Sequence, residues 1–386
     1  MKAIDLEQHN AEVKTVWDAY RAGRPVRVPL FFGINPRFTL AIAEANPGGL
    51  SFEAYLRDPN RMLERQLQHQ EWIRFNLPQD MEMGYPEAGW PVYVDFQNTY
   101  EAAWLGCPLR FHKNQVPDTS PLLANDSKKH LLFDRGIPDP FTGGVMGWNW
   151  EYYHHFLRAK ESGFTYKGIP IGEVTPCGLG TDGPFTVACN VRGATEFLSD
   201  LLADPDYALQ LLDFITEATI TRMQAYRKRL GQPMTTPGWG FADDSIQLIS
   251  SDMYETFVYP YHKRLVETFS EGGPNSIHLC GNATRHFLFL KEHLNVRSFD
   301  TGFPVNFAWL RQTLGPEVEI QGGPTAPFLL EALPPAVEEE TRRILASGIM
   351  DGGRFLLREG NNLAPGTPLD NLWAMYDAVH TYGLYD

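Results

Sequence analysis

The chain has 386 residues, of which 43% are hydrophobic and 21% are charged, so its composition is that of a globular protein and excludes a disordered one. Its formal net charge of -14 would repel phosphate groups, which argues against nucleic acid as a partner. The first twenty residues lack the apolar stretch of a secretory signal, and no segment has the roughly 20 apolar residues of a membrane span. We therefore expect a cytoplasmic protein.

The cysteines are too scattered to form the framework of a small disulfide-linked domain. We expect all four to be reduced thiols. Only Cys280 has neighbours that suggest chemistry. The four are Cys107, Cys177, Cys189 and Cys280.

Short apolar or β-branched runs recur along the chain, and each is followed by a longer stretch with helical character. This alternation is typical of a parallel sheet covered by helices. No repeat or long linker divides the chain, which favours one domain over residues 1–386. The predicted strands are residues 27–32, 91–96, 169–174, 276–280, 296–300, 318–323 and 354–360.

Two late helices are the clearest. Residues 334–348 begin with prolines, end with a glycine and place Val337, Thr341 and Ile344 on one face. Residues 368–383 repeat this pattern. We therefore expect both segments to cover the sheet.

Several predicted strands end in polar residues, although a central parallel strand is normally apolar throughout. In a barrel the functional residues lie at the C-terminal ends of the strands. The sequence therefore predicts a site there, and the polar strand-end residues include Glu173, Cys280, Asp300 and Gln321.

Residues 111–160 depart from the alternation because they are rich in turn-forming and aromatic residues. We interpret them as an inserted loop region that forms a lid or an oligomer contact. The alternative is an aromatic-rich loop that packs against the barrel.

Five segments in the second half of the chain carry a family resemblance. They resemble, in order, motifs of the uroporphyrinogen decarboxylase superfamily, which includes heme-pathway decarboxylases and corrinoid methyltransferases. The resemblance implies an α/β fold, a single (β/α)8 TIM barrel, and it is weaker before residue 170. The segments are residues 183–205, 241–265, 276–282, 321–330 and 360–379.

The sequence also departs from both branches of that superfamily. Heme-pathway decarboxylases have a loop with paired arginines after the first strand, whereas this chain has GINPRF with Arg37 alone. The related methyltransferases bind zinc through a His-x-Cys pair and a distant cysteine. Asn361 stands at that distant position here, and we place it among the catalytic candidates.

His278 and Cys280 are two residues apart on a predicted strand, so their side chains point to the same side. The resemblance implies that they bind zinc. A catalytic zinc needs three protein ligands, and Asp244, Glu173 or a residue of the 111–160 region could supply the third. The alternative is that His278 bonds to the backbone and Cys280 fills an apolar space.

Asp243 and Asp244 follow another predicted strand and face opposite ways. We expect Asp244 to enter the strand mouth, where a carboxylate serves as general acid/base or metal ligand. The alternative is a helix N-cap.

Further candidates are less closely tied to one motif. Asp95 ends an apolar run near the place where the related decarboxylases hold the substrate's pyrrole groups. Arg37 and Arg192 could bind a substrate carboxylate or form salt bridges, and we add Glu173 and Gln321 as substrate-binding candidates.

The leading functional hypothesis is a methyltransferase that moves a methyl group between a methylated donor or a corrinoid protein and a small acceptor, with zinc as a cofactor. One alternative is a metal-free decarboxylase of uroporphyrinogen-like or smaller aromatic acids that uses Asp95, Arg37 and Arg192. Another is a barrel that binds without catalysis. The resemblance also implies a homodimer.

Overall fold

The structure is a computed structural model that describes residues 4–113 and 115–385. Its main sheet has five parallel strands in the order β10-β9-β8-β7-β6. A second sheet pairs β1 with β5 in parallel, and β4 adds to β5 in antiparallel orientation. The strands are β1 (Trp90–Tyr93), β2 (Leu109–Arg110), β3 (Asp118–Thr119), β4 (Thr165–Tyr166), β5 (Ile169–Thr175), β6 (Gly240–Ala242), β7 (Asn275–Leu279), β8 (Val296–Thr301), β9 (Glu319–Gly322) and β10 (Phe355–Leu357).

Helices separate these strands and cover them. None of the helices in the described part of the chain has the length and apolar content needed to cross a lipid bilayer. The helices are α1 (Leu6–Arg21), α2 (Pro36–Leu40), α3 (Phe52–Arg57), α4 (Pro59–Asn76), α5 (Tyr100–Trp104), α6 (Leu131–Arg135), α7 (Met146–Glu161), α8 (Pro184–Arg192), α9 (Ala194–Ala203), α10 (Pro205–Leu230), α11 (Ser251–Phe257), α12 (Tyr259–Phe269), α13 (Phe287–His293), α14 (Phe307–Leu314), α15 (Ala326–Glu331), α16 (Pro334–Ile344) and α17 (Leu369–Tyr382).

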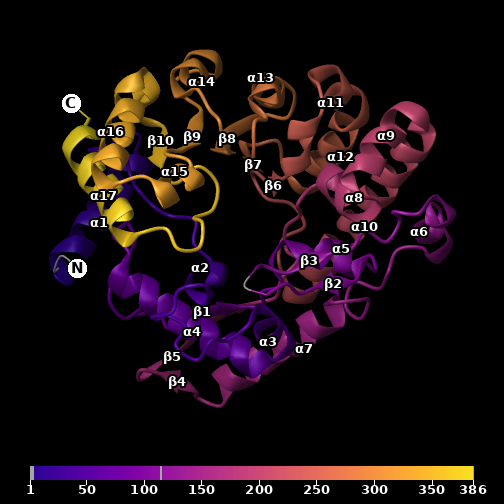
Figure 1. The fold of residues 1–386 in the computed structure, drawn as a ribbon, viewed down its shortest axis with the longest axis horizontal. Coiled ribbons are helices and arrows are strands. Elements are labelled where there is room, and N and C mark those ends of the chain that lie inside the picture. The colour runs from indigo at the N-terminus through magenta and orange to yellow at the C-terminus, as the bar shows by residue number, and fades with distance from the viewer. Residues whose placement is uncertain (1–3, 114, 386) are drawn as a thin grey trace.

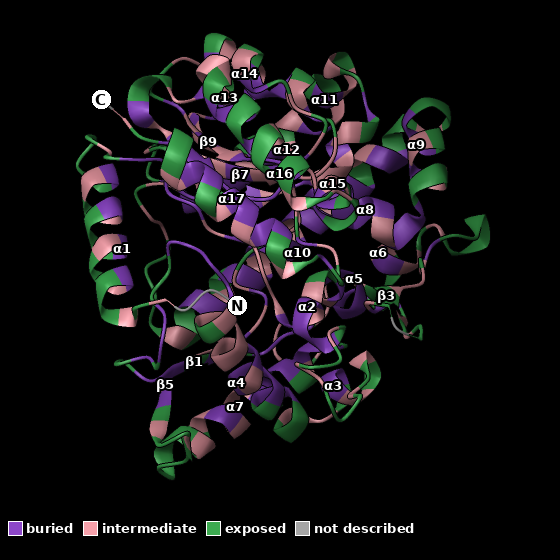
Figure 2. Ribbon diagram, turned by 60° about the vertical axis from the view of Figure 1, so that its left-hand side comes forward, coloured by how far each residue is buried: buried purple, intermediate pink, exposed green. Residues whose placement is uncertain are grey.

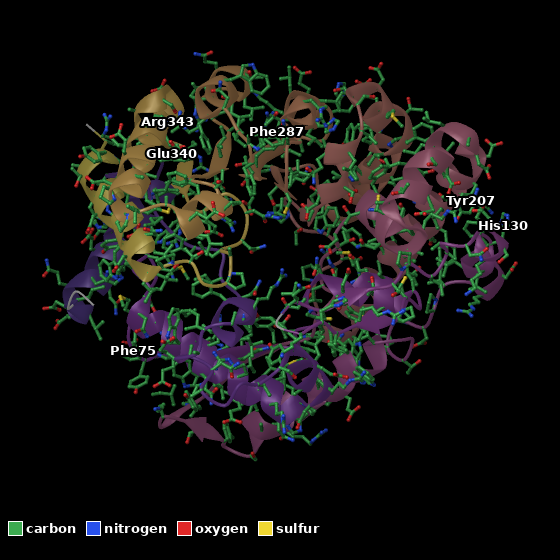
Figure 3. All side chains as sticks on the ribbon, viewed as in Figure 1. Phe75, His130, Tyr207, Phe287, Glu340 and Arg343 are labelled. Carbon is green, nitrogen blue, oxygen red and sulfur yellow. The ribbon has the colours of Figure 1, made fainter. Side chains whose placement is uncertain are left out.

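The elements follow one another around a ring in chain order, so that α17 returns to the side of α1 (Figure 1). Buried residues gather on the strands and on the helix sides that face them, while exposed residues lie on the outer sides (Figure 2). Phe287 of α13, labelled in Figure 3, illustrates this packing because its ring stacks on Phe299 of β8 at a centroid distance of 4.7 Å. Apolar contact between helices and strands therefore holds the framework together.

The predicted strand at residues 27–32 forms isolated bridges and no ladder. Leu30 pairs in parallel with Leu357 of β10, and Arg27 pairs with Leu384. In the described residues no ladder joins this segment to β1 or joins β5 to β6, so the strand pairings do not by themselves close a barrel. The other predicted strands coincide with β1, β5, β7, β8, β9 and β10, and both predicted late helices form as α16 and α17.

The 111–160 region contains more regular structure than its composition suggests. Residues 146–161 form the helix α7, which packs against β5 and α4. Its aromatic residues Tyr152 and Phe156 are one helical turn apart and are both buried against the framework. This part of the region is a covering helix, and looser structure is confined to the residues before it.

A buried ion pair fixes the segment at residues 27–32. Arg27 donates two hydrogen bonds of 2.6 Å to the carboxylate of Asp80, which also accepts the backbone N–H of Leu30 at 2.7 Å. The Arg27 side chain is 4% exposed and that of Asp80 is 0% exposed. A charge left alone at this depth is costly, since water cannot replace the lost partner.

We therefore expect Asp80→Ala to lower the free energy of unfolding by about 3 kcal/mol, measured by urea denaturation, because it leaves Arg27 buried without its main partner. The control is Glu339→Gln, which breaks the exposed pair between Glu339 and Arg342 on α16. The control is expected to unfold like the wild type. Equal unfolding of all three proteins would contradict the role assigned to Asp80.

Candidate metal and catalytic site

Strand β7 carries the first part of the site. Ile277 and Leu279 are buried among the helices, whereas His278 between them is half-buried and points the other way. This alternation follows from the pleat of a strand. Cys280 comes directly after the strand, so His278 and Cys280 project to the same side, as predicted.

Asp244 completes a cluster with this pair. It begins a short 3-10 helix, Asp244–Leu248, directly after β6, and its Oδ1 accepts the backbone N–H of Cys280 at 2.7 Å. His278 Nε2 lies 3.3 Å from Cys280 Sγ and 3.9 Å from Asp244 Oδ1. The prediction that Asp244, rather than Asp243, turns toward the strand mouth agrees with this geometry.

The three side chains have the donor types and spacing of a zinc site. Their ligand atoms all lie within 4.8 Å of one another. Bond lengths of about 2.0–2.3 Å in a tetrahedral zinc site place ligand atoms about 3.3–3.8 Å apart, close to what is seen here. The side chains of His278 and Asp244 are 29% and 37% exposed, so a further ligand can approach from solvent.

The second ring nitrogen of His278 is held by an acid. Nδ1 lies 2.6 Å from Asp300 Oδ2, and the same oxygen accepts a hydrogen bond of 2.7 Å from Arg358 Nη1. Burial opposes the charged imidazole, but the hydrogen bond to Asp300 and the charges of Asp300 and Asp244 outweigh it and raise the pKa of His278. The sequence marked Asp300 only as a polar strand end, without a role, and it did not single out Arg358.

Burial, followed by the charges of Asp244 and then Asp300, raises the pKa of the Cys280 thiol well above its ordinary value. In the metal-free protein this thiol is therefore protonated at neutral pH. A bound cation would reverse the balance, since it stabilises a thiolate directly.

Asn361 lies beside the sulfur. Its backbone φ of 73° places it in the left-handed region at the start of the loop after β10, and its Oδ1 is 3.0 Å from Cys280 Sγ. The thiol donates to this amide oxygen. A thiolate would instead need the amide nitrogen turned toward it, and an amide can supply either atom. Asn361 thus contacts the cluster through the sulfur of Cys280 and adds no charge to the cluster.

Asp182 is an acid near the cluster that the sequence interpretation missed. Burial, then the charges of Glu101 and Asp244, raise its pKa to about 8. Its neighbour Glu101 is neutralised by Arg222, which donates a hydrogen bond of 2.6 Å. No motif marks Asp182, because it precedes Gly183 in an irregular segment before α8 rather than ending a strand.

Asp95 and Arg37 form a separate cluster. Asp95 accepts hydrogen bonds of 2.9 Å from Tyr55 and from the backbone of Gln97, whose side chain bonds both Asp95 and Arg37. Burial raises the pKa of Asp95. In the described residues no hydrogen bond or ion pair links this cluster to His278, so the two predicted catalytic acids, Asp95 and Asp244, belong to separate clusters.

The remaining candidates are engaged elsewhere or exposed. Arg192 is 3% exposed and bonds Asp200 and Asp126 at 2.7 and 2.6 Å, so its guanidinium is already neutralised. Gln321 donates to Ser298 on the neighbouring strand β8 and to Glu319 on its own strand β9, and Glu173 is exposed on β5. None of the three contacts the cluster of Asp244, His278 and Cys280.

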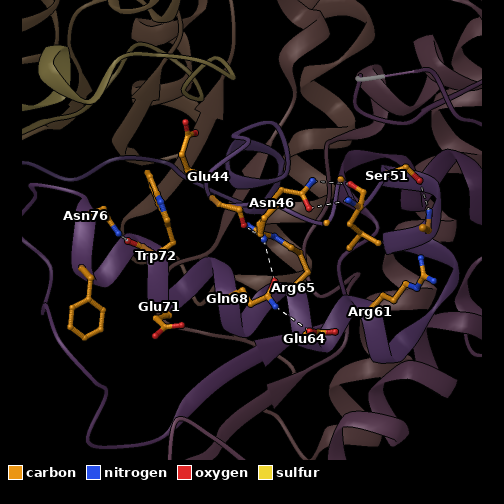
Figure 4. Close-up of a pocket in the computed structure, with 17 residues that line it drawn as sticks. Glu44, Asn46, Ser51, Arg61, Glu64, Arg65, Gln68, Glu71, Trp72 and Asn76 are labelled. Carbon is orange, nitrogen blue, oxygen red and sulfur yellow. Dashed lines mark hydrogen bonds between the residues drawn. The ribbon is translucent and has the colours of Figure 1, made fainter.

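A large cavity lies away from this cluster. It measures about 810 Å³ and opens between α4 and residues 44–51 (Figure 4). Arg65 reaches across from α4 and bonds the carbonyl of Ala45, which ties the loop to the helix. The residues that line the cavity include none of Asp244, His278 and Cys280, so the volume of this cavity is no reason to place the catalytic site there.

A comparison with known protein families shows to which family the chain belongs. Residues 94–382 match the family described as uroporphyrinogen decarboxylase (URO-D). The chain belongs to this family. The relatives of this URO-D family member include both decarboxylases and methyltransferases.

The uroporphyrinogen decarboxylase of Anaeromyxobacter sp. is 30% identical over 206 residues, which are 52% of this chain and 57% of that protein. The methylated-thiol–coenzyme M methyltransferase of Methanosarcina mazei is 29% identical over 289 residues, 72% of this chain and 69% of the relative. The match thus spans little more than half the length of the decarboxylase.

A solved structure shares the fold. The methyltransferase from Methanosarcina mazei superposes with a TM-score of 0.65 at 19% identity, covering 96% of this chain and 98% of that one. This chain therefore shares the arrangement of helices and strands of that structure.

The electrostatics of Cys280 predict its reactivity. In metal-free protein at pH 8, we expect iodoacetamide to alkylate Cys280 more slowly than a free cysteine, because its raised pKa leaves little thiolate. Asp244→Asn removes one of the negative charges that raise this pKa, so alkylation should become faster. Mass spectrometry of the modified peptide measures the rate.

The control for that experiment is Asp252→Asn, which removes a charge from an exposed position in the first turn of α11. It should leave the alkylation rate unchanged. A rate in Asp244→Asn no faster than in this control would contradict the electrostatic account.

Proposed function

We propose that the protein is a methyltransferase that moves a methyl group from a methylated corrinoid, or another methylated donor, to a small acceptor such as a thiol. The observation that carries this proposal is the cluster of Asp244, His278 and Cys280. The relatives support it, because one of them is a methylcobamide:CoM methyltransferase of Methanosarcina acetivorans, 23% identical over 309 residues.

The cluster suits zinc by donor type. His278 Nε2, the Cys280 sulfur and an Asp244 oxygen would hold the ion and leave one position open. A bound zinc ion acts as a Lewis acid that lowers the pKa of a thiol or water beside it. In the overall reaction the acceptor thiol loses its proton to solvent and gains the methyl group, while the corrinoid keeps the electron pair of its broken cobalt–carbon bond.

We also propose that the parallel strands form one (β/α)8 barrel with this site at their C-terminal ends. The site residues support this arrangement, because Asp244, Cys280, Asp300 and Arg358 each lie at or just after the end of β6, β7, β8 or β10. This is where barrel enzymes place their chemistry. Under this proposal the residues before α7 in the 111–160 region form an insertion at one rim.

The contacts around Asp95 favour methyl transfer over decarboxylation. Tyr55 and Gln97 already satisfy the Asp95 oxygens, and Gln97 engages Arg37. Arg192, the third residue of the decarboxylase hypothesis, is neutralised by Asp200 and Asp126. A substrate with several carboxylates needs several free cations, and these arginines do not provide them.

The test combines metal content with turnover. We expect tag-free protein, purified without chelators, to contain close to one zinc per chain by elemental analysis, and Cys280→Ser to lose most of it because one of three ligands is weakened. With methylcobalamin and a small thiol, the wild type should form methyl thioether and cob(I)alamin, and Cys280→Ser should be at least 100-fold slower.

The control is Cys189→Ser, which alters a buried cysteine of α8 that lies outside the cluster. It should keep both zinc and turnover. Release of carbon dioxide from uroporphyrinogen, without zinc and without methyl transfer, would instead establish the decarboxylase. Tight binding of a corrinoid or a tetrapyrrole without turnover would point to a binding protein.

A further inference from the structure

Asp300 occupies a position between a candidate ligand and a buried cation. Its Oδ2 contacts His278 Nδ1 at 2.6 Å and Arg358 Nη1 at 2.7 Å, and its side chain is 18% exposed. Its other oxygen, Oδ1, is buried and has no partner within the described residues. The hydrogen bonds of Asp300 therefore go to one ring nitrogen of His278 and to the guanidinium of Arg358.

Arg358 is held in place through Glu359, which is bonded to the backbone of Gly33. Its side chain is 8% exposed and its Nη2 donates to Glu359 Oε1 at 3.0 Å. Glu359, 0% exposed, in turn accepts the backbone N–H of Gly33 at 3.0 and 3.1 Å. A Cβ atom at Gly33 would lie 2.0 Å from Arg358 Nη2, so the glycine leaves just the space that the guanidinium fills.

A carboxylate at this distance determines which ring nitrogen carries the proton. Asp300 accepts a hydrogen bond from Nδ1–H, so the lone pair of a neutral His278 lies on Nε2. Nε2 is the atom that faces Cys280 Sγ at 3.3 Å and Asp244 Oδ1 at 3.9 Å. The imidazole is thus oriented with its metal-binding atom toward the other two donors before any ion arrives.

We propose that Asp300, held by Arg358, is a positioning residue that fixes the ring orientation and tautomer of His278 and so prepares the cluster for a metal ion. The part that concerns the metal rests on the proposed function. The part that concerns the tautomer holds for the protein alone. Asp300 touches neither the candidate ion position nor a substrate, and it acts through His278.

The same strands carry a matched control for this proposal. Glu319 of β9 pairs with Arg354 at 3.2 Å, and β9 and β8 are in register so that Ser298 faces Glu319 while Asp300 faces Gln321. Glu319 therefore forms an arginine pair near the opposite ends of these strands. It also accepts hydrogen bonds from Tyr20, Ser298 and Gln321, and it forms no hydrogen bond or ion pair with His278. Its loss therefore reports the general destabilisation caused by removing a strand carboxylate that has an arginine partner.

The first measurement is zinc affinity, by competition with a chromophoric chelator, for variants that keep the wild-type circular dichroism spectrum. We expect Asp300→Ala to bind zinc about 10- to 100-fold more weakly, which is typical when the acid behind a metal-binding histidine is lost. Asp300→Asn keeps a hydrogen-bond acceptor without the charge, so its zinc affinity should fall between those of Asp300→Ala and the wild type. Glu319→Ala should match the wild type.

The second measurement needs no metal. Long-range ¹H–¹⁵N NMR of histidine-labelled, metal-free protein at pH 9 reports the tautomer, and His278→Gln assigns the signal. We expect the Nδ1–H form in the wild type and in Glu319→Ala, and a shift toward the Nε2–H form in Asp300→Ala. An unchanged tautomer in Asp300→Ala overturns the proposal.

The two measurements separate this proposal from the proposed function. A wild type that binds no zinc, together with a tautomer shift in Asp300→Ala, leaves the positioning role standing and removes the zinc site. Zinc binding that is equally strong in Asp300→Ala and the wild type shows that Asp300 does not prepare the cluster, although the zinc site stands. Equal weakening in Asp300→Ala and Glu319→Ala also overturns the proposal, because it reduces the effect to general stability.

Discussion

The site depends on the neutralisation of one buried guanidinium, that of Arg358. A cation at this depth without partners would cost several kcal/mol, so the acids around it are a requirement of the fold before they are a feature of the site. Arg358 meets Asp300 on one side and Glu359 on the other. Asp300 also bonds His278. The contacts that neutralise Arg358 therefore also orient a candidate metal ligand.

The acids near the cluster outnumber the cations that neutralise them. Glu101 is paired with Arg222 and Asp300 with Arg358, whereas Asp182 and Asp244 have no ion pair with an arginine or lysine in the described residues. Burial, with this excess of acids added to it, keeps the Cys280 thiol protonated and raises the pKa of Asp182 to about 8. A divalent cation would relieve both effects at once, which gives a physical reason for a metal at this place that is independent of the relatives.

Much of the framework could be predicted from sequence because its signals are local. Strand runs such as 276–280 are short and apolar, and the placement of Asp244 follows from strand alternation. The sequence marked Asp300 as a polar strand end but could not show that it joins His278 to Arg358, since Asp300 and Arg358 are 58 residues apart and meet only through the order of β8, β9 and β10. Likewise, the aromatic residues of α7 resembled a loop because prolines and glycines precede them, and only packing against β5 reveals the helix.

The ring is joined where residues 27–33 meet β10 and α17. Leu30 bridges Leu357, Gly33 bonds Glu359, and Glu12 of α1 contacts His380 of α17 at 3.1 Å. These contacts link residues more than 300 positions apart, so during synthesis the early segment must wait for almost the whole chain to leave the ribosome before it finds its partners. Since Arg358 lies on this junction, a nascent chain lacks the cation that holds Asp300 until residue 358 has been made, so the contacts behind His278 are complete only after that residue has left the ribosome.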